Sequence, residues 1–253
     1  MASTSETGHA KNVANFEDLI SFCTGYGASY NPSKVAIQLP ALSATHANAL
    51  AALANINALL PANTNAVNAR EAAFSPLSKL VTRVVNAADA SDVTKQVKAD
   101  VKTIARKLQG KRATPKKDTP TSPDAPTPAV IASDATAKSI SASQMSFDQR
   151  IENLDKLIQL LAAQPAYIPN EPELTVAGLT ATLGNMRNTN TAAVNAYTPV
   201  SNARINRDTI LYAEGTGLVD LAGDVKSYVK SVFGGTSLQY KQVSGLKFTK
   251  IKS

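Results

Sequence analysis

The sequence predicts an all-α protein built from two tandem, duplicated four-helix up-down bundles that are joined by a proline-rich linker. Three observations predict this class. The sequence contains an internal repeat, so that one part of the chain resembles another. Its apolar residues recur at helical spacing, and strand-like alternation is nearly absent outside two short crossovers and the C-terminal end.

The internal repeat aligns residues 30–70 with residues 167–207 without a gap, at a constant shift of 137 positions. Further on, residues 100–103 match residues 224–227, which pairs the last helix of one copy with the last helix of the other. The matching residues of the first block include Tyr30 and Tyr167, Leu42 and Leu179, Asn48 and Asn185, and Arg70 and Arg207. A repeat of this length predicts architecture and carries no chemistry by itself.

The first repeat is expected to begin after a flexible, polar N-terminal arm over residues 1–10 and to form a bundle over residues 11–110. Its first helix is followed by an extended crossover over residues 30–42, because two prolines there remove donors and restrict the residues before them. We expect Tyr30, like Tyr167 in the second repeat, to pin the crossover to the end of its bundle.

Prolines then divide the rest of the first repeat into helices. Pro61 is expected to end the second helix or to open the third, and Ser75-Pro76 predicts a kink or a restart within the third. The fourth helix begins near Asp92 and ends at Gly110.

The second repeat predicts the same plan over residues 145–234. Between the repeats, residues 111–144 form a basic linker rich in proline, alanine and threonine, a composition typical of extended segments. Residues 235–253 form a basic and apolar C-terminal tail, which we expect to be non-helical.

Composition excludes several classes. The single cysteine, Cys23, rules out an internal disulfide framework, and its place on an apolar stripe predicts a buried, inert thiol. No apolar run reaches the length of a membrane span, and the N-terminal residues do not have the order of a signal peptide, so a cytoplasmic protein is expected.

Basic residues form the sharpest candidate site, because the chain carries a net charge of +7 and clustered cations can neutralise phosphates. A solvated helix face is the competing interpretation, since lysine predominates and no aromatic residues interleave to stack bases. The candidate basic patch comprises Lys95, Lys98, Lys102, Arg106, Lys107, Lys111, Arg112, Lys226 and Lys230.

The tail supplies a second candidate site, because a solvated chain end does not need many bulky apolar residues. We expect it to dock as an irregular strap in a bundle groove, either its own or that of a neighbouring copy. The candidate docking residues are Tyr240, Val243, Leu246, Phe248 and Ile251.

Catalytic, cofactor-binding and metal-binding residues are not predicted. Neither His9 nor His46 belongs to a cluster with metal-ligand spacing, and the sequence lacks a glycine-rich phosphate loop and a nucleophile elbow. Arg70-Glu71 and Arg207-Asp208 are equivalent Arg–acid steps, and sequence neighbours on a helix are not expected to face each other.

The sequence therefore favours a non-catalytic structural or protein-interaction protein, with a protein partner or self-assembly. The alternative is a sequence-independent nucleic-acid-binding protein that uses its lysine-rich helix faces, the start of the linker and the tail.

Overall fold

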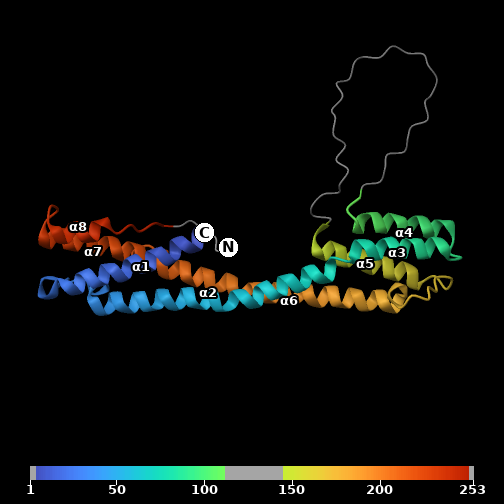
Figure 1. The fold of residues 1–253 in the computed structure, drawn as a ribbon, viewed down its shortest axis with the longest axis horizontal. Helices are drawn as coiled ribbons and strands as arrows, with labels where there is room; N and C mark the ends of the chain where they lie inside the picture. Colours follow the sequence, from blue (N-terminus) through green and yellow to red (C-terminus); the bar gives the residue numbers. More distant parts are fainter. Residues whose placement is uncertain (1–3, 112–144, 251–253) are drawn as a thin grey trace, which may run out of the picture. The chain divides into compact units, whose positions relative to one another are not determined.

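The computed structural model describes residues 4–111 and 145–250, and over these residues it is all-helical, without a strand (Figure 1). This confirms the all-α part of the prediction. The helices are α1 (Thr4–Gly25), α2 (Leu39–Phe74), α3 (Leu77–Ala90), α4 (Lys95–Leu108), α5 (Phe147–Ala162), α6 (Val176–Tyr212), α7 (Leu218–Phe233) and α8 (Leu238–Gly245), with 3₁₀ turns η1 (Gly27–Ser29), η2 (Val35–Ile37) and η4 (Pro172–Leu174). The predicted linker, apart from Lys111, lies outside the described residues.

The long helices α2 and α6 replace the shorter helices that we predicted from the positions of the prolines. Pro61 lies inside α2 and Pro199 lies inside α6, so the prediction that Pro61 bounds a helix is wrong. Each proline lacks a donor and crowds the preceding turn, but both flanks of α2 are held by packing, as the buried Ile56 and Phe74 show. The predicted restart at Ser75-Pro76 is confirmed, because α3 begins at Leu77.

The chain folds into two compact units that cut across the repeats. Unit 1 contains Met1–Thr64 and Asn195–Ser253, and unit 2 contains Asn65–Val194. Each unit therefore combines helices from both repeats, whereas the sequence predicted one bundle per repeat, over residues 11–110 and 145–234. The long helices cause this difference, because each continues past the end of one core and into the other.

In unit 1, α1, α7 and α8 contact one another and pack on the first part of α2 and the last part of α6 (Figure 1). The core is apolar and includes Phe16, Leu19, Leu42, Leu211 and Val225. Helix α1 already begins at Thr4, and His9 is buried within it, which differs from the predicted flexible arm over residues 1–10.

In unit 2, α4 contacts both α3 and α5, and these helices pack on the last part of α2 and the first part of α6 (Figure 1). The core includes Phe74, Val84, Leu154, Leu157 and Met186.

Helices α3 and α7 occupy equivalent places in the two units. Each follows a long helix, and each contacts a crossover turn: α3 contacts η4, and α7 contacts η2. Their buried residues keep one register, which pairs Leu77 with Leu218, Val81 with Ala222, Val84 with Val225, and Ala88 with Val229. The sequence match of residues 100–103 with residues 224–227 paired α7 with α4 instead, so the structure corrects that equivalence.

Candidate interaction surfaces

A buried tyrosine closes the crossover in each unit, as the sequence predicted. The Tyr30 hydroxyl donates to the Ile37 carbonyl at 2.6 Å, and the Tyr167 hydroxyl donates to the Leu174 carbonyl at 2.8 Å. Burial raises the pKa of both phenols, that of Tyr167 to about 12. The two crossovers are thus built alike, and each lies against a helix.

In unit 1 the crossover lies against α7, and the side chain of Tyr228 on α7 fills the space between the two. Its ring lies edge-on to the Tyr30 ring, with centroids 5.3 Å apart. Its hydroxyl accepts a hydrogen bond from the Asn31 backbone N–H at 3.1 Å. An ion pair between Lys34 and Asp224, 2.6 Å from Nζ to Oδ2, adds a second link between the crossover and α7.

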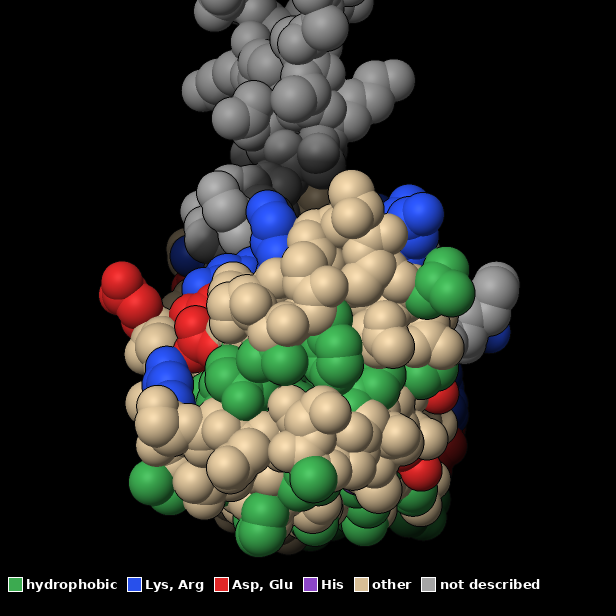
Figure 2. All heavy atoms as spheres, turned by 90° about the vertical axis from the view of Figure 1, so that its left-hand side faces the viewer, with side chains coloured by type: hydrophobic (Ala, Val, Ile, Leu, Met, Phe, Trp, Pro, Cys, Tyr) green, Lys and Arg blue, Asp and Glu red, His purple; other side chains and the backbone are tan. Residues whose placement is uncertain are grey.

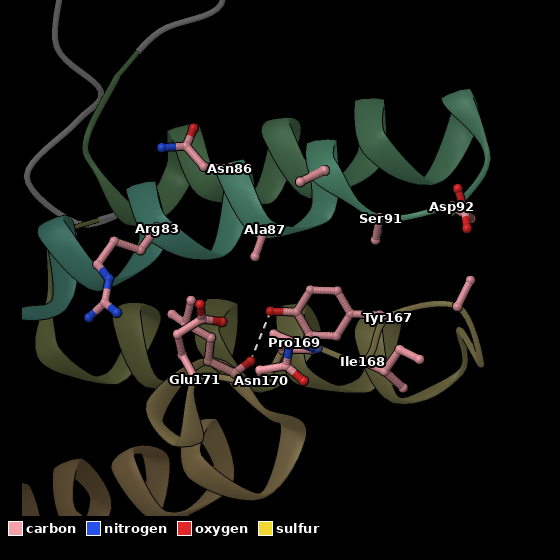
Figure 3. Close-up of a pocket in the computed structure, with 13 residues that line it drawn as sticks. Arg83, Asn86, Ala87, Ser91, Asp92, Tyr167, Ile168, Pro169, Asn170 and Glu171 are labelled. Atoms are coloured by element: carbon pink, nitrogen blue, oxygen red, sulfur yellow. Dashed lines mark hydrogen bonds between the residues drawn. The ribbon is translucent and has the colours of Figure 1, made fainter.

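In unit 2, the corresponding space is a groove of about 580 Å³. Figure 3 shows Ala87 of α3 facing the crossover across this space, with Arg83 and Glu171 toward one end and Ser91 and Asp92 toward the other. In the register that pairs α3 with α7, Ala87 takes the place of Tyr228. The groove is thus open where unit 1 carries an aromatic ring.

The rim of the groove combines apolar and polar groups. Ile168 is 80% exposed, and its backbone N–H donates to no described residue. Beside the groove, Arg83 Nη2 lies 2.8 Å from Glu173 Oε1. The sequence predicted no site here, because pairing α7 with α4 concealed the exchange of tyrosine for alanine.

The predicted tail-docking residues lie on unit 1. Val243 is buried, and Tyr240, Leu246 and Phe248 pack against the same core. Phe248 meets Phe16 of α1 edge-on, with ring centroids 6.4 Å apart. The expectation of a non-helical tail is wrong for residues 238–245, which form α8, and Ile251 lies outside the described residues.

Polar contacts hold the segment after α8 against α1. Asn12 is 2% exposed; its Nδ2 donates to the Thr249 carbonyl at 2.8 Å, and its Oδ1 accepts from the Thr249 N–H at 3.0 Å. Asn15 of α1 donates to the Lys247 carbonyl at 2.7 Å, and Lys250 forms an ion pair at 2.8 Å with Asp220 of α7, which ties the same segment to a second helix.

Two residues of the predicted basic patch contribute to this docking. Lys226 Nζ donates to the Leu246 carbonyl and lies 5.0 Å from the centre of the Phe248 ring. Lys230 Nζ lies 5.7 Å from the centre of the Tyr240 ring. Burial lowers the pKa of Lys226. Lys226 and Lys230 therefore bind the protein's own tail.

The remaining described members of the patch belong to unit 2, on α4 and just after it. Lys102 pairs with Asp89 at 3.0 Å, and Lys98 donates to the Asp89 carbonyl at 2.9 Å. Arg106 donates to the Thr103 hydroxyl at 3.0 Å. Lys95, Lys107 and Lys111 are exposed to solvent, and Arg112 lies outside the described residues.

The other chemically active side chains are held in structural contacts. Cys23 is buried, as predicted, and burial raises its pKa to about 11. His9 Nδ1 lies 2.6 Å from the Tyr212 hydroxyl. His46 is partly buried, with Nε2 3.9 Å from Glu17 Oε2.

The Arg–acid steps differ from each other. Arg207 Nη2 lies 2.7 Å from Asp208 Oδ1, so the expectation that these neighbours do not face each other is wrong. The equivalent Arg70 instead stacks on Phe147, with Cζ 4.1 Å from the ring centre. A planar guanidinium reaches either partner, because its stem is long and flexible.

One end of unit 1 is apolar. Figure 2 shows hydrophobic side chains gathered in a hollow in the middle of this face, with Lys, Arg, Asp and Glu side chains toward its edges. The end of α7 and the start of α8 lie here beside Tyr26, whose ring centroid is 5.2 Å from that of Phe233. The large exposed apolar residues of α7 and α8 are Val232 at 44% and Leu238 at 76%.

Within the described part of the chain, no cluster of three or more His, Cys, Asp or Glu side chains could hold a metal ion, and no helix is long and apolar enough to cross a membrane. Comparisons with protein-family models, curated proteins and solved structures give no match.

Proposed function

We propose that this chain is a non-catalytic, cytoplasmic protein-interaction protein that binds a protein partner, or a second copy of itself, through the apolar end of unit 1. The observation that carries the proposal is the hydrophobic hollow on this face in Figure 2, together with the exposed Val232 and Leu238 on either side of the turn from α7 to α8.

Singly exposed apolar residues are common on protein surfaces and need no explanation. A contiguous apolar patch with a polar edge is different, because monomeric soluble proteins seldom leave such a surface open to water without a use for it. The hollow in Figure 2 adds shape to this chemistry, since a concave apolar surface offers a partner's side chain more contact area than a flat one.

Site-specific photo-crosslinking tests this proposal. A photoreactive phenylalanine analogue at Leu238 should give a protein adduct in native cells, identified by mass spectrometry as a second copy or as another protein. The matched control places the analogue at Ile205, which is 63% exposed on α6 of unit 1. No adduct from position 238, or equal adducts from both positions, would refute the proposal.

Nucleic-acid binding is the second candidate, and the three exposed cations Lys95, Lys107 and Lys111 favour it. Lysine contributes charge without base readout, so binding through these residues should be weak, salt-sensitive and independent of sequence.

Fluorescence anisotropy with labelled single-stranded and double-stranded DNA, at low and at physiological salt, tests this candidate. Changing the three lysines to glutamine should reduce affinity similarly for all sequences. Tight, sequence-selective binding at physiological salt, or binding that the triple variant leaves unaltered, would contradict it.

A further inference from the structure

We infer that the groove of unit 2 binds the side chain of a tyrosine that belongs to a polypeptide partner. The inference rests on the proposed function in one respect only, namely that the tyrosine belongs to a protein partner. It concerns a surface separate from the apolar end of unit 1.

The internal repeat carries the argument, because it provides the same site in an occupied form. In unit 1, a tyrosine crossover residue, Tyr30, packs edge-on against Tyr228, and the next residue, Asn31, donates its N–H to the Tyr228 hydroxyl. In unit 2, Tyr167 takes the place of Tyr30, and Ile168 takes the place of Asn31. Both recognition elements for a phenol are therefore present in the open groove.

The residue that would supply the ring from within the chain is missing. Helix α3 carries Ala87 where α7 carries Tyr228, and Ala90 also lines the space. At about 580 Å³, the groove falls within the roughly 300–1,000 Å³ that is typical of ligand sites. A ring that enters it must come from another molecule, because α3 already occupies the position of the helix that presents it in unit 1.

The chemistry of the groove favours tyrosine over an aliphatic side chain. Tyr167 offers an aromatic neighbour, and edge-to-face pairs of aromatic rings are more favourable than their buried area alone explains. The Ile168 N–H donates to no described residue, so a phenol oxygen can accept its hydrogen bond.

The rim indicates that the ring arrives on a polypeptide. Asn86, Asn170 and Glu171 border the groove. Such amide and carboxylate groups can bind the backbone N–H and C=O groups that flank a tyrosine side chain. A free phenol leaves these polar groups without a partner.

The test is an NMR titration of the full chain with N-acetyl-tyrosinamide, p-cresol and N-acetyl-phenylalaninamide. The tyrosine amide should shift the Ile168 amide and Ala87 methyl signals, and it should bind several-fold more tightly than the phenylalanine amide, which lacks the hydroxyl. It should also bind more tightly than p-cresol. Equal affinity for p-cresol would overturn the polypeptide source.

Two substitutions test the equivalence of the open site beside Ala87 in unit 2 and the filled site at Tyr228 in unit 1. Ala87→Tyr should fill the groove and abolish probe binding, while Ala99→Tyr, at an exposed position on α4, should leave binding intact. Tyr228→Ala should open the equivalent space in unit 1 and raise the number of bound probes from one to two.

Circular dichroism identifies any variant that fails to fold. If Tyr228→Ala does not fold, Ala87→Tyr and Ala99→Tyr still decide the question. Probe binding that survives Ala87→Tyr, or the absence of shifts at Ile168 in the unmodified chain, would overturn the inference. Neither result bears on crosslinking at Leu238, so the two proposals fail separately.

Discussion

The side-chain amide of Asn12 binds both the N–H and the carbonyl of Thr249, at 3.0 Å and 2.8 Å, across 237 positions of sequence. One side chain of α1 thereby satisfies the two backbone groups of a tail residue. The pair joins the beginning of the described chain to its end, within unit 1.

Replacing Asn12 with alanine should lower the free energy of unfolding by about 1–3 kcal/mol, because it removes the partner of two backbone groups at a part-buried site. Urea denaturation measures the change. Asn15→Ala is the matched control: it removes one exposed hydrogen bond to Lys247 and should cost less than about 1 kcal/mol. If both variants lose the same free energy of unfolding, the two Asn12 hydrogen bonds contribute no more than the single exposed bond of Asn15.

Truncation after Gly235 should lower the melting temperature of unit 1, because it removes Val243 and Phe248 from the core. Burial of one such side chain contributes roughly 1.5–3 kcal/mol, so loss of the whole segment should be plainly visible in a thermal scan. Should neither the melting temperature nor the oligomeric state change, the tail would be energetically a free end.

Alkaline conditions should destabilise the protein, and Tyr167 should account for part of the effect. Burial raises the pKa of Tyr167 to about 12 in the folded state, whereas an unfolded tyrosine titrates near its ordinary value of about 10. The unfolded chain therefore loses this proton first, so the contribution to stability is complete below pH ~10 and is lost as the pH rises toward ~12.

Denaturant melts from pH 8 to pH 12 check this linkage against Tyr167→Phe. The variant lacks the titrating hydroxyl, so its stability should fall less steeply with rising pH, although it is less stable at neutral pH because the bond to Leu174 is gone. Parallel pH profiles for the two proteins would contradict the assignment.

Pro61→Ala should stabilise the protein, because alanine restores an N–H inside α2 and removes a steric clash with the preceding turn. Proline in a helix interior costs about 3 kcal/mol relative to alanine, and the looser unfolded chain of the variant offsets a fraction of that gain. Pro199→Ala in α6 should act in the same direction. A lower unfolding midpoint for both variants would show that the prolines are accommodated without cost.

Helical periodicity predicted the class of the fold and the burial of Cys23 correctly, because amphipathic stripes record which residues face a core. The repeat correctly predicted that Tyr30 and Tyr167 have the same role. Proline was misleading at position 61, since its local penalty is smaller than the packing on either side of it.

Sequence similarity also suggested the wrong helix pair. Residues 100–103 resemble residues 224–227, but the place of a helix in a core depends on what it packs against. Helix α7 contacts the crossover turn η2 of its unit, as α3 contacts the equivalent turn η4. The groove beside Ala87 becomes recognisable only after that pairing is corrected. Local sequence could not reveal it, because an alanine on a helix is unremarkable until its counterpart is known to be a tyrosine.

The grouping of the helices has a consequence for the order in which the chain matures on the ribosome. Unit 2 is one continuous stretch, Asn65–Val194, whereas unit 1 needs Met1–Thr64 together with Asn195–Ser253. Synthesis proceeds from the N-terminus, so unit 2 can close as soon as residue 194 has left the exit tunnel. The apolar stripe of α1, made first, must wait for α7 and α8, made last. Nascent chains stalled when residue 194 has just emerged from the exit tunnel should therefore expose α1 to protease while the helices of unit 2 are already protected.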